Sequence, residues 1–414
     1  MTALLTSENA QMAFARFQAV HPVRIHRAGN NAELRQFVNF PKALFGNLPQ
    51  WIDPLDLEVR RFVSDRHPFR LHGEAELLLA KRDQEVVGRV LVSDDPRFNA
   101  VHGTNAGCFG MFHSIDDQMV ADQLLNAAAR WIRQRGRTQL LGPIDYSTNY
   151  QAGLLIDGFN TPPRIFMNHN PPYYVRLLEN WGLRKAKDLY AWWFDRDNSI
   201  DDDWRSRVAR LAERFGVVIR PVRMDRFDEE VALCRDLYNE AWQDNWGFVK
   251  MTEAEFNEFA QGLKKIANPN MVLIAEVQGI PVGLAITVPD LNEAIAPLGG
   301  RLTRFGLPVG LARLLGRMKK IKTARLAALG VTPGYRRRGI AEMLIQHTFD
   351  YGKDVLGYTG AELSWTLEDN PMINRAIERV GGHRYKTYRV YQRDLVAPAG
   401  RIRQRTLAAL PVQK

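Results

Sequence analysis

The stretch from Leu329 to Ala341 reads Leu-Gly-Val-Thr-Pro-Gly-Tyr-Arg-Arg-Arg-Gly-Ile-Ala and carries the pattern that decides the fold. An apolar run over 324–331 leads into it, and such a run predicts a buried strand. Pro333 and Gly334 then end the strand. Apolar residues return at helical spacing from Ile340 onward. The sequence therefore predicts a strand, a cationic turn and a helix.

The turn between these two elements has the features of an anion-binding site. Free backbone N–H groups and the positive end of the helix dipole favour an anion at a helix start. Gly339 lets an anion approach the backbone, and Arg336 to Arg338 can donate charge-assisted hydrogen bonds to phosphate oxygens. A Walker A loop is excluded because no Gly-Lys-Ser/Thr follows, and Gly-x-Gly-x-x-Gly is absent. The alternative is an ordinary strand–helix turn with a solvated basic surface.

Residues 336–341 fit the pattern Arg/Gln-x-x-Gly-x-Gly/Ala, which resembles the acyl-CoA pyrophosphate loop of the GNAT superfamily of N-acyltransferases. The resemblance covers residues 215–395 directly. It implies acetyl-CoA or a longer acyl-CoA as co-substrate, without a metal. It also implies that the pantetheine arm enters a gap between two splayed strands, held by their backbone and by a polar group beyond the second strand. The residues that the resemblance assigns to acyl-CoA binding are Leu329, Val331, Arg336, Arg337, Arg338, Gly339, Ile340, Ala341, Asn370 and Asn374.

Acyl transfer to an amine requires that the attacking nitrogen be neutral, so a base or a chain of water molecules should remove its proton. The segment 361–368 reads Ala-Glu-Leu-Ser-Trp-Thr-Leu-Glu and alternates between polar and apolar residues. This alternation predicts a strand with Glu362 and Glu368 on its polar face and Leu363 on the other. The two carboxylates are the candidate bases. The alternative for each is a solvent-exposed charge or an ion-pair partner.

The group that would protonate the leaving thiolate is less clearly marked. Many members of the family place a tyrosine in the helix after this strand, but this chain has Ile377 there. Tyr388 or Tyr391 could take that role instead. A thiolate also leaves readily without an acid, so the reaction does not require one.

Composition narrows the class of protein. The chain has 414 residues, 45% of them apolar and 25% charged, and is long enough for two packed domains. A net charge of +10 favours acidic partners such as a nucleotide cofactor, an anionic membrane surface or nucleic acid. The only cysteines are Cys108 and Cys234, so we expect a reducing compartment and no zinc cluster. With no signal peptide or membrane span evident, we expect a cytoplasmic protein with optional contact at the inner face of the membrane.

The second half of the chain repeats the first half. Small residues, glycines and Asn-Pro dipeptides recur in the same order and at nearly the same spacing over a whole domain, which argues for tandem copies of one fold. The matched pairs are Ala80 and Ala275, Gly88 and Gly283, Asn170 and Asn370, and Gly182 and Gly382.

We therefore expect an α/β protein with two tandem GNAT-like domains, each a mixed, mostly antiparallel twisted sheet flanked by helices. The expected boundaries are 1–200 for a degenerate first domain, 201–398 for the catalytic domain and 399–414 for a basic tail. The first copy has only His-Ser-Ile between Phe112 and the helix start at Asp116, so it lacks the CoA loop. Its expected role is to pack on the second copy and shape the acceptor cleft.

The segment 291–322 is longer than a simple connection requires, and it contains an amphipathic pattern. Such a helix can lie in a membrane interface or act as a lid over an apolar tunnel, although packing on the core is the simpler alternative. Its apolar face holds Leu311, Leu314, Leu315 and Met318, and its cationic face holds Arg313, Arg317 and Lys320.

These observations converge on an acyl-CoA-dependent N-acyltransferase that acts on a primary amine. The whole-chain pattern is similar to a family of bacterial tandem GNAT proteins associated with sphingoid-base N-acylation, as in bacterial ceramide synthesis, which places the expected reaction in lipid metabolism. The alternative is a non-catalytic acyl-CoA-binding or regulatory protein on a degenerate acyltransferase pair. Specific nucleic-acid binding is not expected, because no helix-turn-helix or RNA-binding signature occurs.

Overall fold

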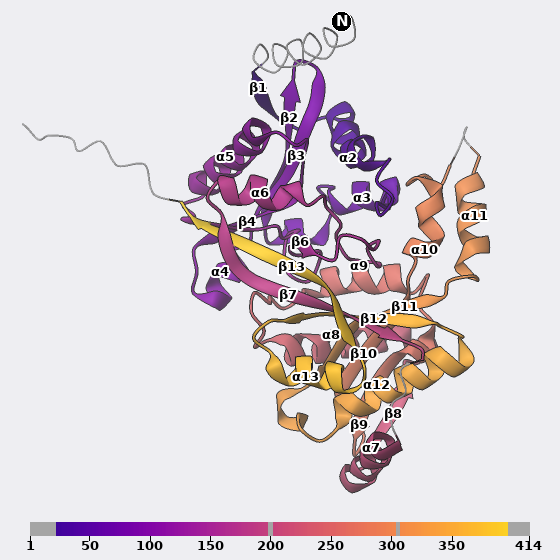
Figure 1. Ribbon diagram of the computed structural model, residues 1–414. Coiled ribbons are helices and arrows are strands. Elements are labelled where there is room, and N and C mark those ends of the chain that lie inside the picture. The colour runs from indigo at the N-terminus through magenta and orange to yellow at the C-terminus, as the bar shows by residue number, and fades with distance from the viewer. Residues whose placement is uncertain (1–21, 198–201, 304–306, 396–414) are drawn as a thin grey trace, which may run out of the picture.

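The computed structural model describes residues 22–197, 202–303 and 307–395, which share one twisted sheet with helices on both faces (Figure 1). The first 21 residues of the expected first domain, the basic tail and the boundary between residues 200 and 201 lie outside these ranges. The proposed domain limits therefore remain a proposal.

Within the described ranges the sheet has thirteen strands. In the first half these are β1 (Val23–Arg27), β2 (Glu74–Arg82), β3 (Glu85–Asp94), β4 (Ala106–Ser114), β5 (Gln139–Gly142), β6 (Leu154–Asp157) and β7 (Arg184–Asp195). In the second half they are β8 (Val217–Pro221), β9 (Val272–Val277), β10 (Ile280–Pro289), β11 (Thr323–Val331), β12 (Gly360–Leu367) and β13 (His383–Asp394).

The pairing of the strands confirms the internal repeat. The order is β1-β2-β3-β4-β5-β13-β7-β12-β11-β10-β9-β8, so each half follows the same path inward from its own edge. The pairs β4–β5 and β11–β12 are parallel, and the other pairs are antiparallel. The matched residues also pair with one another, Ala80 with Gly88 and Ala275 with Gly283.

One matched pair needs a correction. Gly182 follows helix α6 (Tyr173–Asn180) with a φ of +96°, and its N–H donates to the carbonyl of Glu179. The glycine with the same role after helix α13 (Pro371–Arg379) is Gly381, with a φ of +94° and a bond to Glu378. The equivalent of Gly182 is therefore Gly381 and not Gly382, because only the first glycine has the left-handed conformation that ends the helix.

The two halves exchange their last strands. Strand β13 of the second half lies between β5 and β7, while β7 of the first half lies between β13 and β12. Figure 1 shows both strands crossing the junction between the halves. The sheets expected for two separate domains are consequently joined into one.

The remaining helices cover both faces of this sheet. The first half contains α2 (Asn31–Phe45), α3 (Asp56–Phe62), α4 (Pro96–His102) and α5 (Gln118–Gln134). The second half contains α7 (Asp202–Phe215), α8 (Phe227–Trp242), α9 (Glu253–Leu263), α10 (Asn292–Ile295), α11 (Val309–Met318) and α12 (Ile340–Asp350), which continues into a π-helical turn at Tyr351–Val355.

In the second half, the alternation of side chains along β10 separates two hydrophobic clusters. Ala285 packs with Ile340 and Leu344 of α12 on one face. Leu284, Ile286 and Val288 pack with α8 and α9 on the other face. Helix α9 begins at a capping box, in which Thr252 and Glu255 satisfy each other's backbone N–H groups.

Strand β12 departs from the predicted alternation. Its register against β7 shifts between Glu362 and Trp365, and Ser364 has a φ of +61°. As a result, Leu363 packs with the α12 side of the sheet, whereas Trp365 and Leu367 pack in the cluster that holds Tyr388. The predicted regular alternation over 361–368 is wrong beyond Leu363, because the bulge reverses it.

Candidate active site

The parallel strands β11 and β12 separate after three paired residues. They pair at Thr323–Gly360, Ala324–Ala361 and Arg325–Glu362. Beyond that point β11 continues along β10, and β12 continues along β7. The side chain of Ser364 bridges the start of the resulting gap, since its hydroxyl lies 2.9 Å from Nη2 of Arg325 and 3.4 Å from the carbonyl of Ala327. The gap between two strands that the family resemblance implies is therefore present.

The loop after β11 presents backbone N–H groups at the start of α12. It contains a 3₁₀ turn at Pro333–Tyr335 and left-handed conformations at Arg337 (φ +67°) and Gly339 (φ +78°). Among the described residues, the amides of 337–342, which include Ile340 and Ala341, have no acceptor. Free amides at a helix start form an anion-binding site.

The three arginines of the loop have different surroundings. Arg336 donates to the carbonyls of Val331 and Ala241, at 3.3 and 2.9 Å, and so ties the loop to the end of α8. Arg338 stacks on the ring of Tyr335, with 4.5 Å between its Cζ and the ring centroid. Arg337 is exposed and has no side-chain partner in the described part of the chain. Arg337 therefore has all of its side-chain donors available to an anion, whereas Arg338 also donates from Nη2 to the carbonyl of Gly334 at 3.3 Å.

The structure gives two reasons for glycine at position 339. A Cβ atom at Gly339 would lie 2.8 Å from Cδ1 of Leu211 in α7, so the absent side chain makes room for a helix. The positive φ adds a second requirement for glycine. The expectation that this glycine also lets a phosphate approach the backbone stays a prediction.

The other residues assigned to acyl-CoA lie around the gap. Leu329 and Val331 pair with Ala285 and Gly283 along one side of β11, which leaves its other side facing the gap. Asn370 caps α13 by accepting from the N–H of Ile373.

Asn374 closes the far end of β12 with two hydrogen bonds. Its Oδ1 accepts from the hydroxyl of Thr366 at 2.5 Å, and its amide donates to the carbonyl of Leu367 at 3.1 Å. Both asparagine side chains therefore have partners within the protein, and their contact with pantetheine stays a prediction.

Glu362 lies at the base of the gap and is completely buried. Its Oε1 is 2.9 Å from Nε of Arg325, and its Oε2 accepts a hydrogen bond from the hydroxyl of Tyr385. Burial raises the pKa of the Glu362 carboxyl, and Arg325 only partly offsets this effect. A carboxylate with a raised pKa beside the gap suits a general base.

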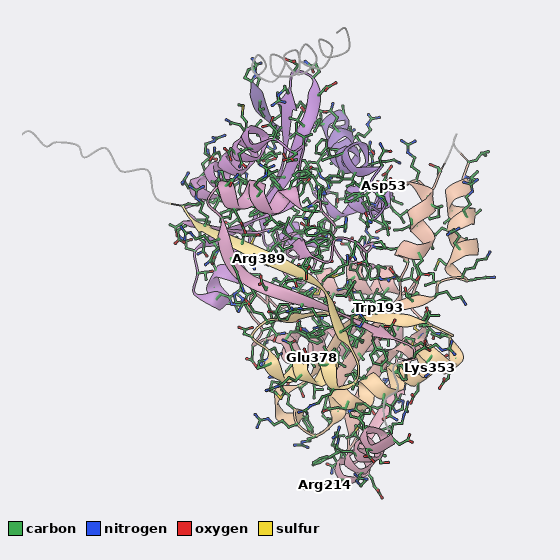
Figure 2. The ribbon with its side chains drawn as sticks, in the orientation of Figure 1. Asp53, Trp193, Arg214, Lys353, Glu378 and Arg389 are labelled. Carbon is green, nitrogen blue, oxygen red and sulfur yellow. The ribbon has the colours of Figure 1, made fainter. Side chains whose placement is uncertain are left out.

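The first half of the chain completes this charged cluster. Arg164 stacks on Trp193, with 4.3 Å from Cζ to the ring centroid, and lies 3.1 Å from Oδ2 of the buried Asp290. Lys386 is also buried, which lowers its pKa to about 8, and its Nζ donates to two carbonyls of the first half. Figure 2 shows Trp193 at the junction between the halves, beside the crossing strands.

The other two predicted catalytic residues lie elsewhere. Glu368 accepts from Lys185 Nζ at 2.5 Å and from the N–H of Asp188 at 3.0 Å. Tyr388 is completely buried, and its hydroxyl donates to the carbonyl of Asn168 at 3.1 Å. Both are held by structural partners, and their catalytic roles stay predictions.

Tyr385 is the residue at the gap that the sequence did not single out. It is half-buried, and its hydroxyl donates a hydrogen bond to Glu362. The sequence shows Tyr385 three residues before Tyr388 in a tyrosine-rich strand. Only the register of the strands in the structure shows that Tyr385, and not Tyr388, contacts Glu362.

The described residues contain neither a metal site nor a membrane-spanning helix. No group of histidine, cysteine and carboxylate side chains there could hold a metal ion. In the same part of the chain, no helix has both the length and the apolar character needed to cross a membrane.

Comparisons with known proteins agree with this geometry. The family model described as Acetyltransferase (GNAT) family matches residues 231–381, which include the loop and the gap. The chain is 38% identical over 371 residues to a protein of Caulobacter vibrioides (strain NA1000 / CB15N) named bacterial ceramide synthase, covering 88% of this chain and 95% of the relative. The chain belongs to the GNAT acyltransferase family. As a GNAT N-acyltransferase, it uses an acyl-CoA donor and an amine acceptor.

Two further proteins are similar to this GNAT acyltransferase along most of its length. Protein YghO of Escherichia coli (strain K12) is 35% identical over 373 residues, covering 88% of this chain and 94% of the relative. A solved tandem GNAT protein from the clavulanic acid biosynthesis pathway has a TM-score of 0.53 at 12% identity, covering 90% of this chain and 98% of that one. The latter shows the tandem fold alone. The family assignment favours the enzyme over the alternative of a non-catalytic acyl-CoA-binding protein.

Proposed function

We propose that this enzyme transfers an acyl group from acyl-CoA to the primary amine of a long-chain, sphingoid-type base. The observation that carries this proposal is the similarity to the Caulobacter bacterial ceramide synthase over nearly the whole chain. The exposed hydrophobic residues described below support a lipid acceptor rather than a small soluble amine.

In this proposal the CoA pyrophosphate binds the free amides at the start of α12, with Arg337 as its side-chain donor. The pantetheine arm follows β11 along Leu329 and Val331 into the gap. Asn370 and Asn374 border the far side of the gap at the end of β12.

The chemical step uses Glu362 and Tyr385. The amine nitrogen attacks the thioester carbonyl while its proton passes to the Tyr385 oxygen and the hydroxyl proton of Tyr385 passes to Glu362. Backbone N–H groups of β11 that face the gap stabilise the oxyanion. The C–S bond then breaks, the amide is released, and the CoA thiolate takes up a proton. Glu368 as base and Tyr388 as acid remain the alternative assignment.

Helix α11 supports a contact with an anionic membrane. Leu314 is buried beneath the helix, but Leu311 and Leu315 are 42% and 56% exposed. Arg313 and Arg317 of the helix and Lys320 just beyond its end are exposed as well. Figure 1 shows α10 and α11 projecting from the side of the molecule. A basic helix with exposed apolar residues is suited to a lipid surface that supplies a long-chain amine.

The test of this function is an assay of the full chain with palmitoyl-CoA and a sphingoid base, with free thiol and amide product as readouts. We expect stoichiometric release of both. Arg337→Ala should weaken acyl-CoA binding about tenfold, because it removes one charge-assisted contact. Arg336→Ala is the matched control, since Arg336 contacts protein carbonyls and its loss should change stability more than affinity. Thiol release without amide, or binding unchanged in Arg337→Ala, would contradict the proposal.

A further inference from the structure

A pocket of about 60 Å³ lies between α12 and the sheet in the second half. Its walls are almost entirely apolar and come from β7, β10, β11, β12 and the end of α12. Figure 2 shows Lys353, one of its lining residues, at the outer edge of this half. Its lining residues include Thr287, Ala324, Leu326, Thr348, Gly352 and Leu363.

The pocket adjoins the gap between β11 and β12. Its walls include Ala324 and Leu326, which flank Arg325, and Ala361 and Leu363, which flank Glu362. Because successive side chains of a strand point to opposite faces, the pocket and the Glu362 carboxylate lie on opposite faces of the sheet. A chain that passes through the sheet where the two strands separate would enter this pocket.

Helix α12 changes form beside the pocket. It widens into a π-helical turn at Gly352, which lines the pocket, and such turns occur often at functional sites.

We infer that this pocket holds the distal end of the acyl donor's alkyl chain, an inference that rests on the proposed function. The donor is favoured over the amine because its pyrophosphate site is the start of α12, the helix that also roofs the pocket. The amine then approaches from the opposite face, where Glu362 and Tyr385 lie. The volume is several times the 10–15 Å³, roughly, that a single water-sized sphere fills, so the pocket admits the terminal carbons of a chain.

Filling the pocket tests this inference. A Cβ atom at Gly352 would lie 3.5 Å from Cε of Met271 and Cδ2 of Tyr358, in ordinary contact, so Gly352→Leu places its bulk in the pocket. Gly262→Leu is the matched control, because Gly262 lies near the end of α9 with nothing within 4 Å. Calorimetric titration with palmitoyl-CoA and with acetyl-CoA would measure affinity for each variant. We expect Gly352→Leu to lose at least tenfold in palmitoyl-CoA affinity with acetyl-CoA affinity unchanged.

The outcomes separate the inference from the function on which it rests. Failure of the wild type to bind either CoA ester overturns both. Binding with the same palmitoyl-CoA affinity in Gly352→Leu and the control overturns the pocket assignment alone. If Gly352→Leu loses both ligands, Thr348→Leu decides, because it fills the same pocket from the helix itself. A variant that changes the preferred chain length of the amine, and not of the donor, would place the acceptor there and overturn the inference.

Discussion

Individual residues at the base of the gap combine structural and chemical demands. Glu362 and Arg325 form a buried ion pair, and removing one partner of such a pair leaves an uncompensated buried charge. A loss of activity in a Glu362 variant could therefore result from misfolding as well as from lost catalysis. Tyr385 separates the two effects, because its hydroxyl contacts Glu362 without belonging to the ion pair.

We expect Tyr385→Phe to lower kcat about a hundredfold, since it breaks the proton path between the amine and Glu362. Acyl-CoA affinity should be unchanged, and the free energy of unfolding should fall by only about 1 kcal/mol. Glu362→Gln should instead cost about 3 kcal/mol of unfolding free energy, because Arg325 loses its counter-charge. Steady-state kinetics and urea unfolding measure these effects. Wild-type kcat in Tyr385→Phe would remove this residue from the mechanism.

Gly339 offers a second prediction at a single position. An alanine in the left-handed conformation costs roughly 1–2 kcal/mol. Gly339→Ala should lower the free energy of unfolding by more than this, because its Cβ also displaces Leu211. Gly334→Ala, in the same loop with nothing within 4 Å, is the control and should be nearly neutral. Urea unfolding of both variants checks this, and equal stabilities would show that α7 does not pack on the loop in solution.

Among the helices and strands, the sequence predicted those elements whose formation depends on nearby residues alone. The order of strand, cationic turn and helix over 323–350 follows from apolar runs and from the Pro and Gly residues between them. The bulge at Ser364 could not be predicted, because the polar–apolar alternation of 361–368 is regular and the shift arises from pairing with β7. For the same reason the sequence singled out Tyr388 and passed over Tyr385.

Helix α11 gives a prediction that belongs to an element as a whole. Replacing Arg313, Arg317 and Lys320 together with Glu should abolish binding to vesicles rich in anionic lipid, since each cation contributes about 1 kcal/mol near such a surface. Leu311→Ser combined with Leu315→Ser should weaken binding to neutral and anionic vesicles alike. Vesicle co-sedimentation measures both. Unchanged binding in the two sets of variants would leave α11 as a packed surface helix.

Over the whole molecule, the two halves are joined by a charged contact as well as by the sheet. His72 of the first half lies 3.5 Å from Asp95 and 3.3 Å from Glu255 of α9. Burial alone would lower the pKa of His72, but the two carboxylates raise it to about 9. The same contact lowers the pKa of Glu255 to about 2, against the effect of its own burial.

This contact predicts the pH dependence of stability. Because the pKa of His72 is raised on folding, its contribution is complete below about pH 6.5, the pKa of an unperturbed histidine, and is lost as the pH rises through about 9. We expect the thermal midpoint of the protein to fall over that interval. His72→Gln should be less stable at pH 6 and should show a smaller fall. Parallel curves for the two proteins would mean that His72 does not carry this dependence.

The exchange of β7 and β13 has a consequence for how the protein is made. The edge of β5 that β13 covers is complete at Gly142, but β13 ends at Asp394, at the far end of the described chain. At 5–20 residues per second, roughly 250 further residues take about 10–50 s to synthesise. During that time the first half leaves the ribosome with an open strand edge, which is a site for aggregation or for pairing with another nascent chain. The strand that covers this edge of β5 is thus translated after every other strand of the described sheet.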